Sequence, residues 1–342
     1  MENMGELDSF NNLWKNRPVL VTGGAGFIGS WLADALIQRG AEVLVLDKKE
    51  TIPQLGGHYE VIRSKTKYIR GDVKDEKALK DIFSLHQIVT VFHLAAETQV
   101  GDALLNPKEA LDTNIRGTWN ILEIARQIKP HPEVILASSD KAYGSHPTLP
   151  YTEDFSLEGR SPYDCSKSCA DLIAQMYAQT YGVPVCVTRC GNVYGGGDLN
   201  FSRLVPGTIR SLLKNERPEI RSDGFYLRDY NFINDIVSAY ITAAEALIGW
   251  KIKNGVFNFG TGKSERVIDV VSKIIKFMGV PLEPMILSSA EHEIKDQYLD
   301  ATKARKVLGW HPEVSLEDGL RHTVIWYQDV FKKYGQSLTL EA

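Results

Sequence analysis

The sequence contains no apolar run that approaches the ~20 residues of a membrane-spanning helix, and the polar stretch from Met1 to Asn16 lacks the apolar core of a cleavable signal. An excess of basic residues is also missing, because the formal net charge is −4 and lysine and arginine are dispersed along the chain. These absences argue against membrane insertion and against the electrostatic footprint of a nucleic-acid-binding protein. We therefore expect a cytoplasmic protein with no membrane and no nucleic acid among its partners.

Cysteine is scarce, with four residues in a chain of 342. They form two Cys-x-x-x-Cys pairs, Cys165 with Cys169 and Cys186 with Cys190, and such spacing would suit a zinc site. One pair lies in a helical pattern and the other in an apolar strand pattern. We therefore expect free buried thiols and no metal site.

The rest of the composition is that of an ordinary globular protein, 43% hydrophobic and 24% charged, without internal repeats or low-complexity segments. Strand-like runs alternate with helical patterns, including Thr113–Ile128 and Tyr163–Tyr181, which is typical of a doubly wound parallel α/β sheet. The strand-like runs are Val19–Thr22, Val43–Asp47, Tyr68–Arg70, Val89–His93, Val134–Ser138 and Val185–Arg189.

A glycine-rich turn follows the first of these runs. In Pro18-Val-Leu-Val-Thr-Gly-Gly-Ala-Gly-Phe-Ile-Gly29 an apolar strand breaks into glycines and is followed by a helix with one apolar face. Glycines at this spacing allow a tight turn, close approach of the backbone to phosphates, and close packing of the helix on the strand, with the anion at the positive helix end. The motif predicts a dinucleotide pyrophosphate site formed by Gly23, Gly26, Phe27, Ile28 and Gly29.

An acidic residue ends the second strand pattern. The run Glu42–Asp47 is continuously apolar until its last residue, which lies about 20 positions past the glycines. We expect Asp47 to bind the adenosine ribose hydroxyls, and a carboxylate there repels the extra phosphate of NADP, so the sequence predicts NAD. Lys48 and Lys49 follow directly and would weaken this preference. The alternative is a turn aspartate after a strand.

The rhythm changes after Gly191, where short strands and helices near Arg203–Leu213, Asp235–Leu247 and Arg266–Met278 replace the regular alternation. Ser315-Leu-Glu-Asp318 resembles a capping box that opens a last amphipathic helix through about Lys333. We predict a Rossmann domain with a smaller C-terminal substrate-binding lobe. The predicted boundaries are 1–16 for a loose extension, 17–190 with 229–260 for the cofactor domain, and 191–228 with 261–342 for the lobe.

Tyr163 and Lys167 lie four residues apart in a helical pattern and hence on one helix face. A neighbouring cation stabilises phenolate, so this pair predicts a tyrosine that acts as a base toward a sugar hydroxyl. The alternative is an exposed Tyr and Lys that are neighbours by chance.

Ser138-Ser-Asp-Lys141 ends a strand pattern, and the carboxyl ends of strands in a doubly wound sheet face the ligand crevice. We expect Ser139 to hydrogen-bond the hydroxyl that Tyr163 deprotonates. Asp140 and Lys141 are an acid and a base in adjacent positions, which suits proton removal and leaving-group protonation. A solvated Asp-Lys turn is the alternative.

These motifs resemble the extended short-chain dehydrogenase/reductase family that acts on nucleotide sugars. The resemblance spans about Arg17 to Lys333 and is carried by Thr22-Gly-Gly-Ala-Gly-Phe-Ile-Gly29, Phe92-His-Leu-Ala-Ala96, Asn114-Ile-Arg-Gly-Thr118 and Tyr163 to Lys167. Within the family, three segments are most similar to CDP-glucose 4,6-dehydratases. These segments are Ser138-Ser-Asp-Lys-Ala-Tyr-Gly144, Gly191-Asn-Val-Tyr-Gly-Gly-Gly-Asp198 and Arg203-Leu-Val-Pro206.

The resemblance implies further roles. By position, the adenine would be bordered by Asp72 and Val73. The ribose and pyrophosphate would be lined by Leu94, Ala95, Ala96 and Thr98, and the cofactor crevice would contain Asn114. Substrate diphosphate or nucleotide would be held by Asn192, Arg203 and Arg228, and a guanidinium fork suits phosphate. His93 belongs to the family strand pattern and is expected to pack rather than react.

The activity implied by the resemblance is a 4,6-dehydration through bound NAD, with Lys141 as the base for the carbon 5 proton and Asp140 as the acid for the departing hydroxyl. Two alternatives stay open. A nucleotide-sugar epimerase uses the same Tyr163 and Lys167, and the segment Leu227–Ile233 is closer to a generic epimerase pattern. A non-catalytic NAD-sensing protein on the same fold would not need Ser139, Tyr163 and Lys167 together. The resemblance also implies a homodimer that pairs through helices near residues 105–128 and 162–181.

Overall fold

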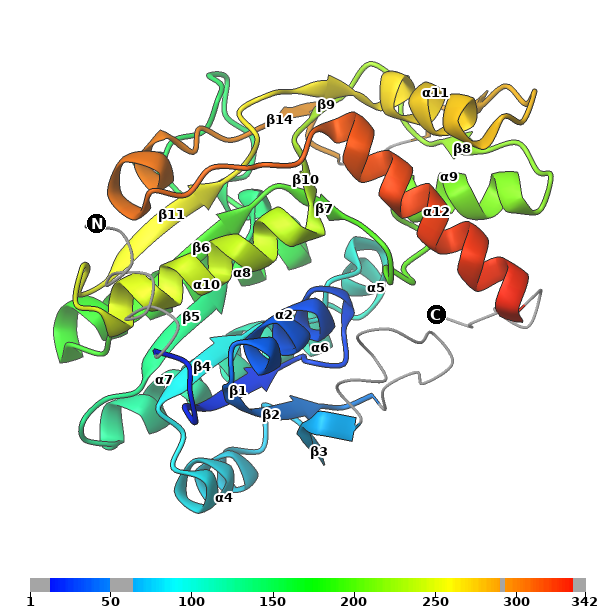
Figure 1. Ribbon diagram of the computed structural model, residues 1–342. Coiled ribbons are helices and arrows are strands. Elements are labelled where there is room, and N and C mark those ends of the chain that lie inside the picture. Colours follow the sequence, from blue (N-terminus) through cyan, green and yellow to red (C-terminus); the bar gives the residue numbers. More distant parts are fainter. Residues whose placement is uncertain (1–12, 50–63, 290–292, 335–342) are drawn as a thin grey trace, which may run out of the picture. The chain divides into compact units, whose positions relative to one another are not determined.

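The computed structural model describes residues 13–49, 64–289 and 293–334 (Figure 1), and these form two compact units. The first unit comprises Met1–Gly144, Glu153–Arg189 and Val237–Phe257. The second comprises Ser145–Thr152, Cys190–Ile236 and Asn258–Ala342. The chain thus re-enters the first unit at Val237, later than the predicted residue 229, because the segment 229–236 makes its contacts within the second unit.

A seven-stranded sheet organises the first unit, in the order β11-β6-β5-β4-β1-β2-β3. The pairs that join β3 through β6 in this order are all parallel, which confirms the predicted doubly wound sheet. The order reverses at β1, which pairs with β2 on one side and β4 on the other, and such a reversal marks the ligand crevice of this fold. The strands are β1 (Pro18–Thr22), β2 (Glu42–Asp47), β3 (Lys67–Arg70), β4 (Thr90–His93), β5 (Glu133–Ala137), β6 (Val185–Cys190) and β11 (Gly255–Phe259).

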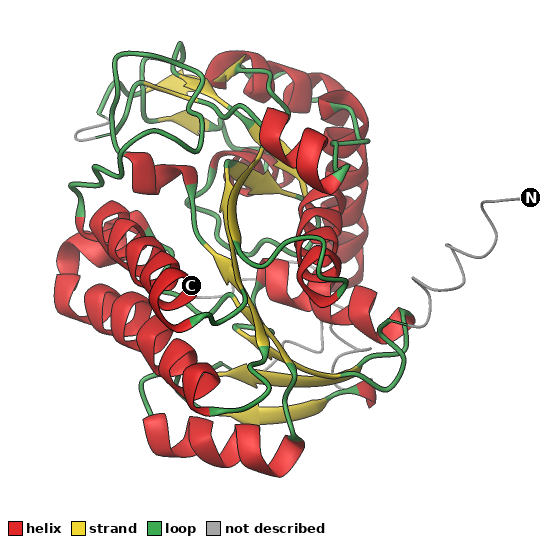
Figure 2. Cartoon of the chain, turned by 90° about the vertical axis from the view of Figure 1, so that its left-hand side faces the viewer, coloured by secondary structure: helices red, strands yellow, loops and turns green. Residues whose placement is uncertain are grey.

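Helices cover both faces of this sheet (Figure 2). On one face α4, α7 and α8 pack side by side, and α2 lies against β1 and β2. The helices of this unit are α2 (Phe27–Gln38), α4 (Glu76–His86), α5 (Val100–Leu105), α6 (Pro107–Leu111), α7 (Gly117–Gln127), α8 (Pro162–Tyr181) and most of α10 (Ile233–Ile248). The predicted helix Thr113–Ile128 differs at its start, where a π-helical turn, Asp112–Arg116, joins α6 to α7.

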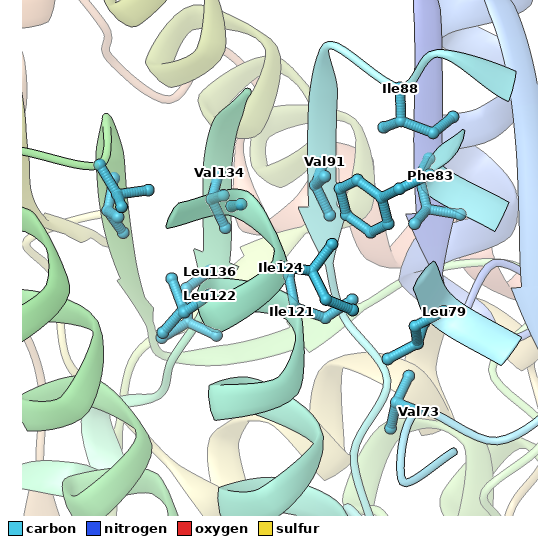
Figure 3. Packing of buried hydrophobic residues seen from close by; sticks show 14 of the residues in the cluster. Val73, Leu79, Phe83, Ile88, Val91, Ile121, Leu122, Ile124, Val134 and Leu136 are labelled. Carbon is cyan, nitrogen blue, oxygen red and sulfur yellow. The ribbon is translucent and has the colours of Figure 1, made fainter. Parts of the chain in front are cut away.

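The apolar core beneath α4, α7 and α8 explains why these segments fold as they do (Figure 3). Leu79 and Phe83 recur at helical spacing in α4, and Ile121 and Ile124 do so in α7, so that each helix presents one apolar face to the strands. Val91 lies on the strand side of this cluster and is completely buried. Burying a side chain of this kind contributes about 1.5–3 kcal/mol, so this layer supplies much of the stability of the unit.

Both ends of α8 are fixed by local sequence. Ser161 accepts a hydrogen bond from the Asp164 N–H at 3.2 Å, and Pro162 occupies the first helical position. The helix ends at Gly182, whose φ of 69° is left-handed and favours glycine. Helix α8 therefore begins at a defined residue, and this fixes the positions of Tyr163 and Lys167 along the helix.

The second unit is built from short strands and three packed helices, α9 (Leu204–Leu213), α11 (Val267–Met278) and α12 (Leu316–Tyr334). Ser315 caps α12 by accepting from the Asp318 N–H at 3.1 Å, as the capping motif predicts. The strands form three small sheets: β7 (Asn192–Tyr194) with β10 (Tyr230–Phe232), β8 (Glu219–Ile220) with β13 (Met285–Ile286), and β9 (Leu227–Arg228) with β12 (Glu265–Arg266) and β14 (Asp296–Gln297).

Two sequence-based expectations need correction. The predicted loose extension, residues 1–16, includes Trp14, which is only 1% exposed and donates to Glu245 Oε1 at 2.8 Å, so the end of this segment packs into the first unit. Residues 1–12 lie outside the described residues. All four cysteines are free thiols, but only Cys186 and Cys190 are buried, since the pair on α8 lies at intermediate exposure. Among the described residues, no helix has the length and apolar character that a membrane crossing requires.

Candidate functional site

The glycine-rich loop after β1 leads directly into α2. Gly23 has a φ of 70°, and a Cβ there would lie 2.8 Å from the Ala95 nitrogen. A Cβ on Gly29 would collide with the Gly23 backbone, so the helix packs against the loop only because this residue is glycine. Gly26 begins α2 without a side-chain cap, and the first turn carries no acidic residue. The N–H groups of Phe27 and Ile28 thus stand at a helix end suited to an anion.

Asp47 lies at the end of β2 and faces this loop. Its Oδ2 accepts from the Ala25 N–H and its Oδ1 from the Lys49 N–H, both at 3.0 Å. Burial raises the pKa of Asp47, while these backbone hydrogen bonds oppose that rise. The carboxylate is therefore held in one orientation beside the glycines, where the sequence places the ribose site.

Asp72 and Val73 follow β3 and are held by α7. Asp72 Oδ1 accepts from the Lys74 N–H at 2.9 Å, and Val73 is buried against Gly117, where a Cβ would lie 2.5 Å from its side chain. The Asn120 amide donates to the Val73 carbonyl at 3.0 Å and closes the turn. The two residues predicted to border the adenine thus form a rigid turn after the strand next to Asp47.

The segment after β4 runs beside β1. The Leu94 N–H donates to the Thr22 carbonyl at 3.1 Å, and the Ala95 N–H donates to the Thr22 hydroxyl at 3.2 Å. This pairing brings Leu94 and Ala95 next to Gly23 of the glycine loop; Ala96 follows directly, whereas Thr98 further along is exposed. These residues are therefore neighbours of the turn to which the sequence assigns the pyrophosphate.

His93 is packed, as expected. Its Nδ1 lies 2.7 Å from the Thr22 hydroxyl and its Nε2 3.2 Å from the Thr118 hydroxyl. Burial, with the charge of Lys167 as a smaller cause, lowers the pKa of His93 to about 3. The ring is consequently neutral at physiological pH, and both nitrogens are engaged in hydrogen bonds within the core.

Asn114 joins three segments from the π-helical turn. Its Oδ1 accepts from the Glu97 N–H at 2.8 Å, and its Nδ2 donates to the Glu97 carbonyl at 3.1 Å and to the Ser166 hydroxyl at 2.8 Å. Single π turns are often found at functional sites. Here the turn places the buried Asn114 amide between the loop after β4 and helix α8. Its partner on α8 is Ser166, which the sequence analysis did not identify.

Taken together, these residues fit a dinucleotide cofactor. The uncapped start of α2 suits a pyrophosphate, and the glycine loop leaves no room for a Cβ at Gly29. Asp47 adds an oriented acceptor at the neighbouring strand end, which suits ribose hydroxyl donors. The N-cap residue is Gly26, which has no side chain to cap the helix, so the N–H groups of the first turn can bind an anion.

Tyr163 and Lys167 lie on successive turns of α8. Lys167 is nearly buried, donates to the Ala137 carbonyl at 2.9 Å, and places its ammonium 5.9 Å from the centre of the Tyr163 ring. The hydrogen bond anchors the cation at the carboxyl end of β5, beside the predicted crevice. The pair therefore combines a phenol with a fixed neighbouring positive charge.

A short 3₁₀ turn, Asp140–Tyr143, presents the polar residues that follow β5. Ser139 caps this turn, because its hydroxyl accepts from the Lys141 N–H at 3.2 Å and donates to Asp140 Oδ1 at 3.1 Å. Asp140 is only 3% exposed, so the structure argues against the solvated-turn alternative. Burial raises the pKa of Asp164 on α8, and the nearby charge of Lys141 opposes that rise.

The 3₁₀ turn is fastened to α8 by a hydrogen bond between the Ser168 hydroxyl and the Ala142 carbonyl at 2.7 Å. Both elements belong to the first unit and pack against each other. Ser139, Asp140, Lys141, Tyr163 and Lys167, which the sequence assigned to one site, are thus carried by two adjoining elements.

A buried ion pair beneath these residues was missed by sequence reasoning. Asp171 on α8 accepts from Arg189 Nε on β6 at 2.8 Å and from the Ser138 hydroxyl at 2.8 Å. Arg189 also donates to the Tyr143 hydroxyl at 2.8 Å. Burial lowers the pKa of Arg189, but the bonds to Asp171 outweigh it and raise that pKa above its usual range. One signal was available, because Tyr163, Lys167 and Asp171 recur at i, i+4 and i+8 on one helix face.

The remaining predicted residues lie in the second unit. Asn192 begins β7 and donates to the Asp229 carbonyl at 3.4 Å. Arg203 precedes α9 and pairs with the buried Asp198 at 3.0 Å. Arg228 is 7% exposed and donates to the carbonyls of Ile294 and Lys295, so its guanidinium ties β9 to the segment before β14.

Comparison with known proteins gives consistent matches along most of the chain. Residues 20–323 match the model of a family described as GDP-mannose 4,6 dehydratase. The chain is 33% identical over 316 residues to a protein of Methanocaldococcus jannaschii named putative UDP-glucose 4-epimerase, covering 91% of this chain and 98% of that one. It is 32% identical over 338 residues to the CDP-glucose 4,6-dehydratase of Salmonella typhimurium, covering 93% and 92%.

Among solved structures, dTDP-glucose 4,6-dehydratase from Bacillus anthracis in complex with NAD superposes with a TM-score of 0.81 at 27% identity, covering 94% of this chain and 100% of that one. The agreement extends from the sequence motifs to the sheet that carries them. The chain therefore belongs to the GDP-mannose 4,6 dehydratase family of extended short-chain dehydrogenases/reductases, which comprises nucleotide-sugar 4,6-dehydratases and 4-epimerases with NAD as cofactor.

Proposed function

We propose that this protein is a nucleotide-sugar 4,6-dehydratase that converts a CDP-glucose-like substrate to a 4-keto-6-deoxy sugar nucleotide. The observation that carries the proposal is the acid and base pair on the 3₁₀ turn, with Asp140 nearly buried and the turn fastened to the helix of Tyr163 and Lys167. Dehydration needs a proton donor for the departing hydroxyl in addition to the tyrosine base, and Asp140 meets that need. The Salmonella typhimurium relative supports the same activity.

The cofactor is assigned to residues of the first unit. Gly23, Gly26 and Gly29, with the start of α2, hold the pyrophosphate, and Asp47 holds the adenosine ribose. Further contacts come from Phe27, Ile28, Asp72, Val73, Leu94, Ala95, Ala96, Thr98 and Asn114, with Tyr163 and Lys167 at the nicotinamide end. When bound, NAD supplies a reversible hydride acceptor, so the sugar is oxidised and later reduced without net redox change.

The first protein step is proton removal from the sugar 4-hydroxyl by the Tyr163 phenol oxygen. The Lys167 ammonium, fixed on the Ala137 carbonyl, stabilises the negative charge on that oxygen, and the Ser139 hydroxyl hydrogen-bonds the same sugar hydroxyl. Oxidation at carbon 4 gives a ketone, and a ketone acidifies the neighbouring proton on carbon 5.

The second step is elimination of water. Lys141 removes the carbon 5 proton while Asp140 protonates the departing 6-hydroxyl, so one water leaves for each sugar and a double bond forms between carbons 5 and 6. The 4-keto-6-deoxy product would then require return of the hydride, which bound NAD would supply, to carbon 6 and of the proton on Lys141 to carbon 5. In the second unit, Asn192, Arg203 and Arg228 are the proposed contacts for the substrate diphosphate and nucleotide, where a guanidinium suits phosphate.

The test is a mass-spectrometric screen of CDP-, dTDP-, UDP- and GDP-hexoses with the purified protein and NAD. The proposal predicts that one of them loses the mass of one water, with no accumulation of NADH. An unchanged mass for every hexose would overturn it.

An epimerase is the second candidate, and it is favoured by the Methanocaldococcus jannaschii relative and by the epimerase-like segment Leu227–Ile233. Asp140→Asn separates the two. A dehydratase should lose on the order of 10²-fold or more in rate with this variant because the leaving hydroxyl is no longer protonated, whereas an epimerase should keep most of its rate.

We further propose a cytoplasmic homodimer that pairs through α7 and α8. Large apolar side chains are exposed along these helices, with Trp119 at 43%, Leu172 at 55% and Met176 at 41%. Helices α7 and α8 contact each other, and exposed apolar side chains on neighbouring helices suit an interaction site. Light scattering should give a dimer mass for the wild type and a monomer mass for Leu172→Glu, while Leu85→Glu on α4, a matched exposed leucine, should stay dimeric. A monomeric wild type would refute the pairing.

A further inference from the structure

Two lysines near Asp47 are bound by carboxylates from three different segments. Lys48 Nζ lies 3.0 Å from Glu109 Oε1 and 3.3 Å from Asp72 Oδ2. It also lies 3.7 Å from Glu97 Oε1. Lys74 Nζ lies 2.6 Å from Glu109 Oε1 and 3.7 Å from Asp72 Oδ2. Glu109, on α6, is the carboxylate that contacts both lysines most closely.

By formal charge, the cluster consists of two lysines and three carboxylates. Hydrogen bonds from Lys74 and then Lys48 lower the pKa of Glu109 to about 2. Burial lowers the pKa of Lys48, but the hydrogen bond to Glu109 and the charge of Asp72 outweigh it and raise that pKa. Two cations therefore face three anions, and the cluster carries one net negative charge in addition to that of Asp47.

The cluster borders the adenosine end of the cofactor site. Lys48 directly follows Asp47, whose Oδ2 accepts from Ala25 in the glycine loop. Asp72 follows β3, the strand that pairs with β2, so that Asp47 and Arg70 lie opposite each other in the sheet. A 2′-phosphate on the adenosine ribose would thus enter a region where two lysines, Lys48 and Lys74, are already held by carboxylates.

We propose that Glu109 is a specificity-determining residue that favours NAD over NADP by holding Lys48 and Lys74 in ion pairs, out of reach of a 2′-phosphate. This accounts for Lys48, one of the two lysines, with Lys49, that the sequence analysis expected to weaken the preference set by Asp47. The inference rests on the proposed assignment of Asp47 to the adenosine ribose. It adds a determinant on α6, 61 residues from Lys48 in the chain.

The physical basis is competition for the same ammonium groups. A bound phosphate that lacks a cationic partner loses hydration at a cost in binding free energy, and the nearby carboxylates repel it. Lysine is a point charge on a flexible stem, so once released it can turn toward a new anion. Removing Glu109 therefore deletes one negative charge and takes from both lysines their closest carboxylate, which leaves them only the longer contacts to Asp72 and Glu97. The affinity for NAD, which has no 2′-phosphate, should change little.

The experiment measures the dissociation constants of NAD and NADP by calorimetry on the intact protein freed of bound nucleotide. Glu109→Gln should tighten NADP binding relative to NAD by roughly fivefold to tenfold, and the gain should shrink at high salt because exposed charges are screened. Adding Lys48→Met to this variant should remove most of the gain. The matched control is Asp81→Asn, which breaks an exposed ion pair with Lys77 on α4 and should leave the ratio unchanged.

The outcomes separate this inference from the assignment beneath it. If the wild-type protein binds NAD and Glu109→Gln leaves the ratio of the NAD and NADP dissociation constants unchanged, the role of Glu109 is overturned, while the assignment of Asp47 is not affected. Asp47→Asn should also relax the preference, and if it does not, the ribose assignment fails together with the inference. Glu109→Ala should behave like Glu109→Gln, because the effect depends on the charge rather than on the amide.

Discussion

The two units of this protein each contain a buried arginine, and they use it differently. In the first unit Arg189 pairs with the Asp171 carboxylate at 2.8 Å and joins strand β6 to helix α8. In the second unit Arg228 donates to the carbonyls of Lys295 at 2.6 Å and Ile294 at 2.5 Å, has only a longer ion pair with Glu293 at 3.7 Å, and joins a short strand to a connecting segment. In the first unit the buried arginine thus fixes two regular elements close to the proposed catalytic residues. In the second unit the buried arginine holds irregular backbone.

The difference matters because catalysis and binding tolerate different amounts of movement. Proton transfer requires donor and acceptor within hydrogen-bond reach, so Tyr163 and Asp140 need a rigid support. A binding residue on a connecting segment can adjust to its ligand, which is why recognition residues are often found on loops. We therefore expect changes in the first unit to act on rate and folding, and changes in the second to act on substrate affinity.

The largest effect is expected for Tyr163→Phe in the first unit. Loss of the phenol oxygen removes the proposed base, and the turnover number should fall by about 10²- to 10⁴-fold with little change in thermal stability. Steady-state kinetics on the sugar nucleotide found by the screen would measure this. Tyr181→Phe removes a hydroxyl from the same helix at an exposed position and should keep wild-type turnover. Equal turnover in both variants would contradict the assignment of Tyr163.

A large effect on folding is expected for Asp171→Asn. This change leaves Arg189, whose side chain is 2% exposed, without its counter-charge, and removing one partner of a buried pair costs about 3–5 kcal/mol. Denaturant unfolding would measure the loss. The matched control is Asp269→Asn in the second unit, which breaks an exposed pair with Arg266 and should cost under about 1 kcal/mol. Similar losses in the two variants would remove the contrast between the units.

A smaller effect is expected for Arg228→Lys, which keeps the charge but loses the guanidinium fork. If this arginine contacts the substrate diphosphate, KM for the sugar nucleotide should rise by roughly tenfold while kcat changes little. Arg221→Lys alters an exposed arginine that donates to the Ser202 carbonyl and should leave KM unchanged. A lower melting temperature with unchanged KM would show that Arg228 serves only the backbone of its own unit.

Several regular elements of the first unit were predictable because they are encoded locally. Strands β1 and β2 are largely apolar runs, the glycines between β1 and α2 permit a turn that other residues obstruct, and Ser161 and Gly182 mark the ends of α8. Helical spacing alone put Tyr163 and Lys167 on one face. The long helix predicted from Thr113 was only partly correct, because a π-helical turn interrupts it where Asn114 meets Glu97 and Ser166.

The division into units was less predictable than the strands. The chain crosses between the units within α10 and β11, so these boundaries fall inside regular elements and not between them. Trp14 shows the same limit at the other end of the chain. Its stretch is polar and was expected to be loose, yet its indole is buried and bound to Glu245, a residue 231 positions away.

By itself, the sequence determined the α/β class, the cofactor turn and the spacing of the tyrosine and lysine pair, because these depend on hydrophobic period, glycine placement and helix geometry within a few residues. The ion pair of Asp171 with Arg189 and those of Glu109 with Lys48 and Lys74 depend instead on how the folded chain brings distant segments together. Those partners are 18, 61 and 35 residues apart, and a charge carries no local signal of its distant partner. They meet because the sheet and helices bring remote segments together, and low exposure then makes the pairing of Asp171 with Arg189 energetically necessary.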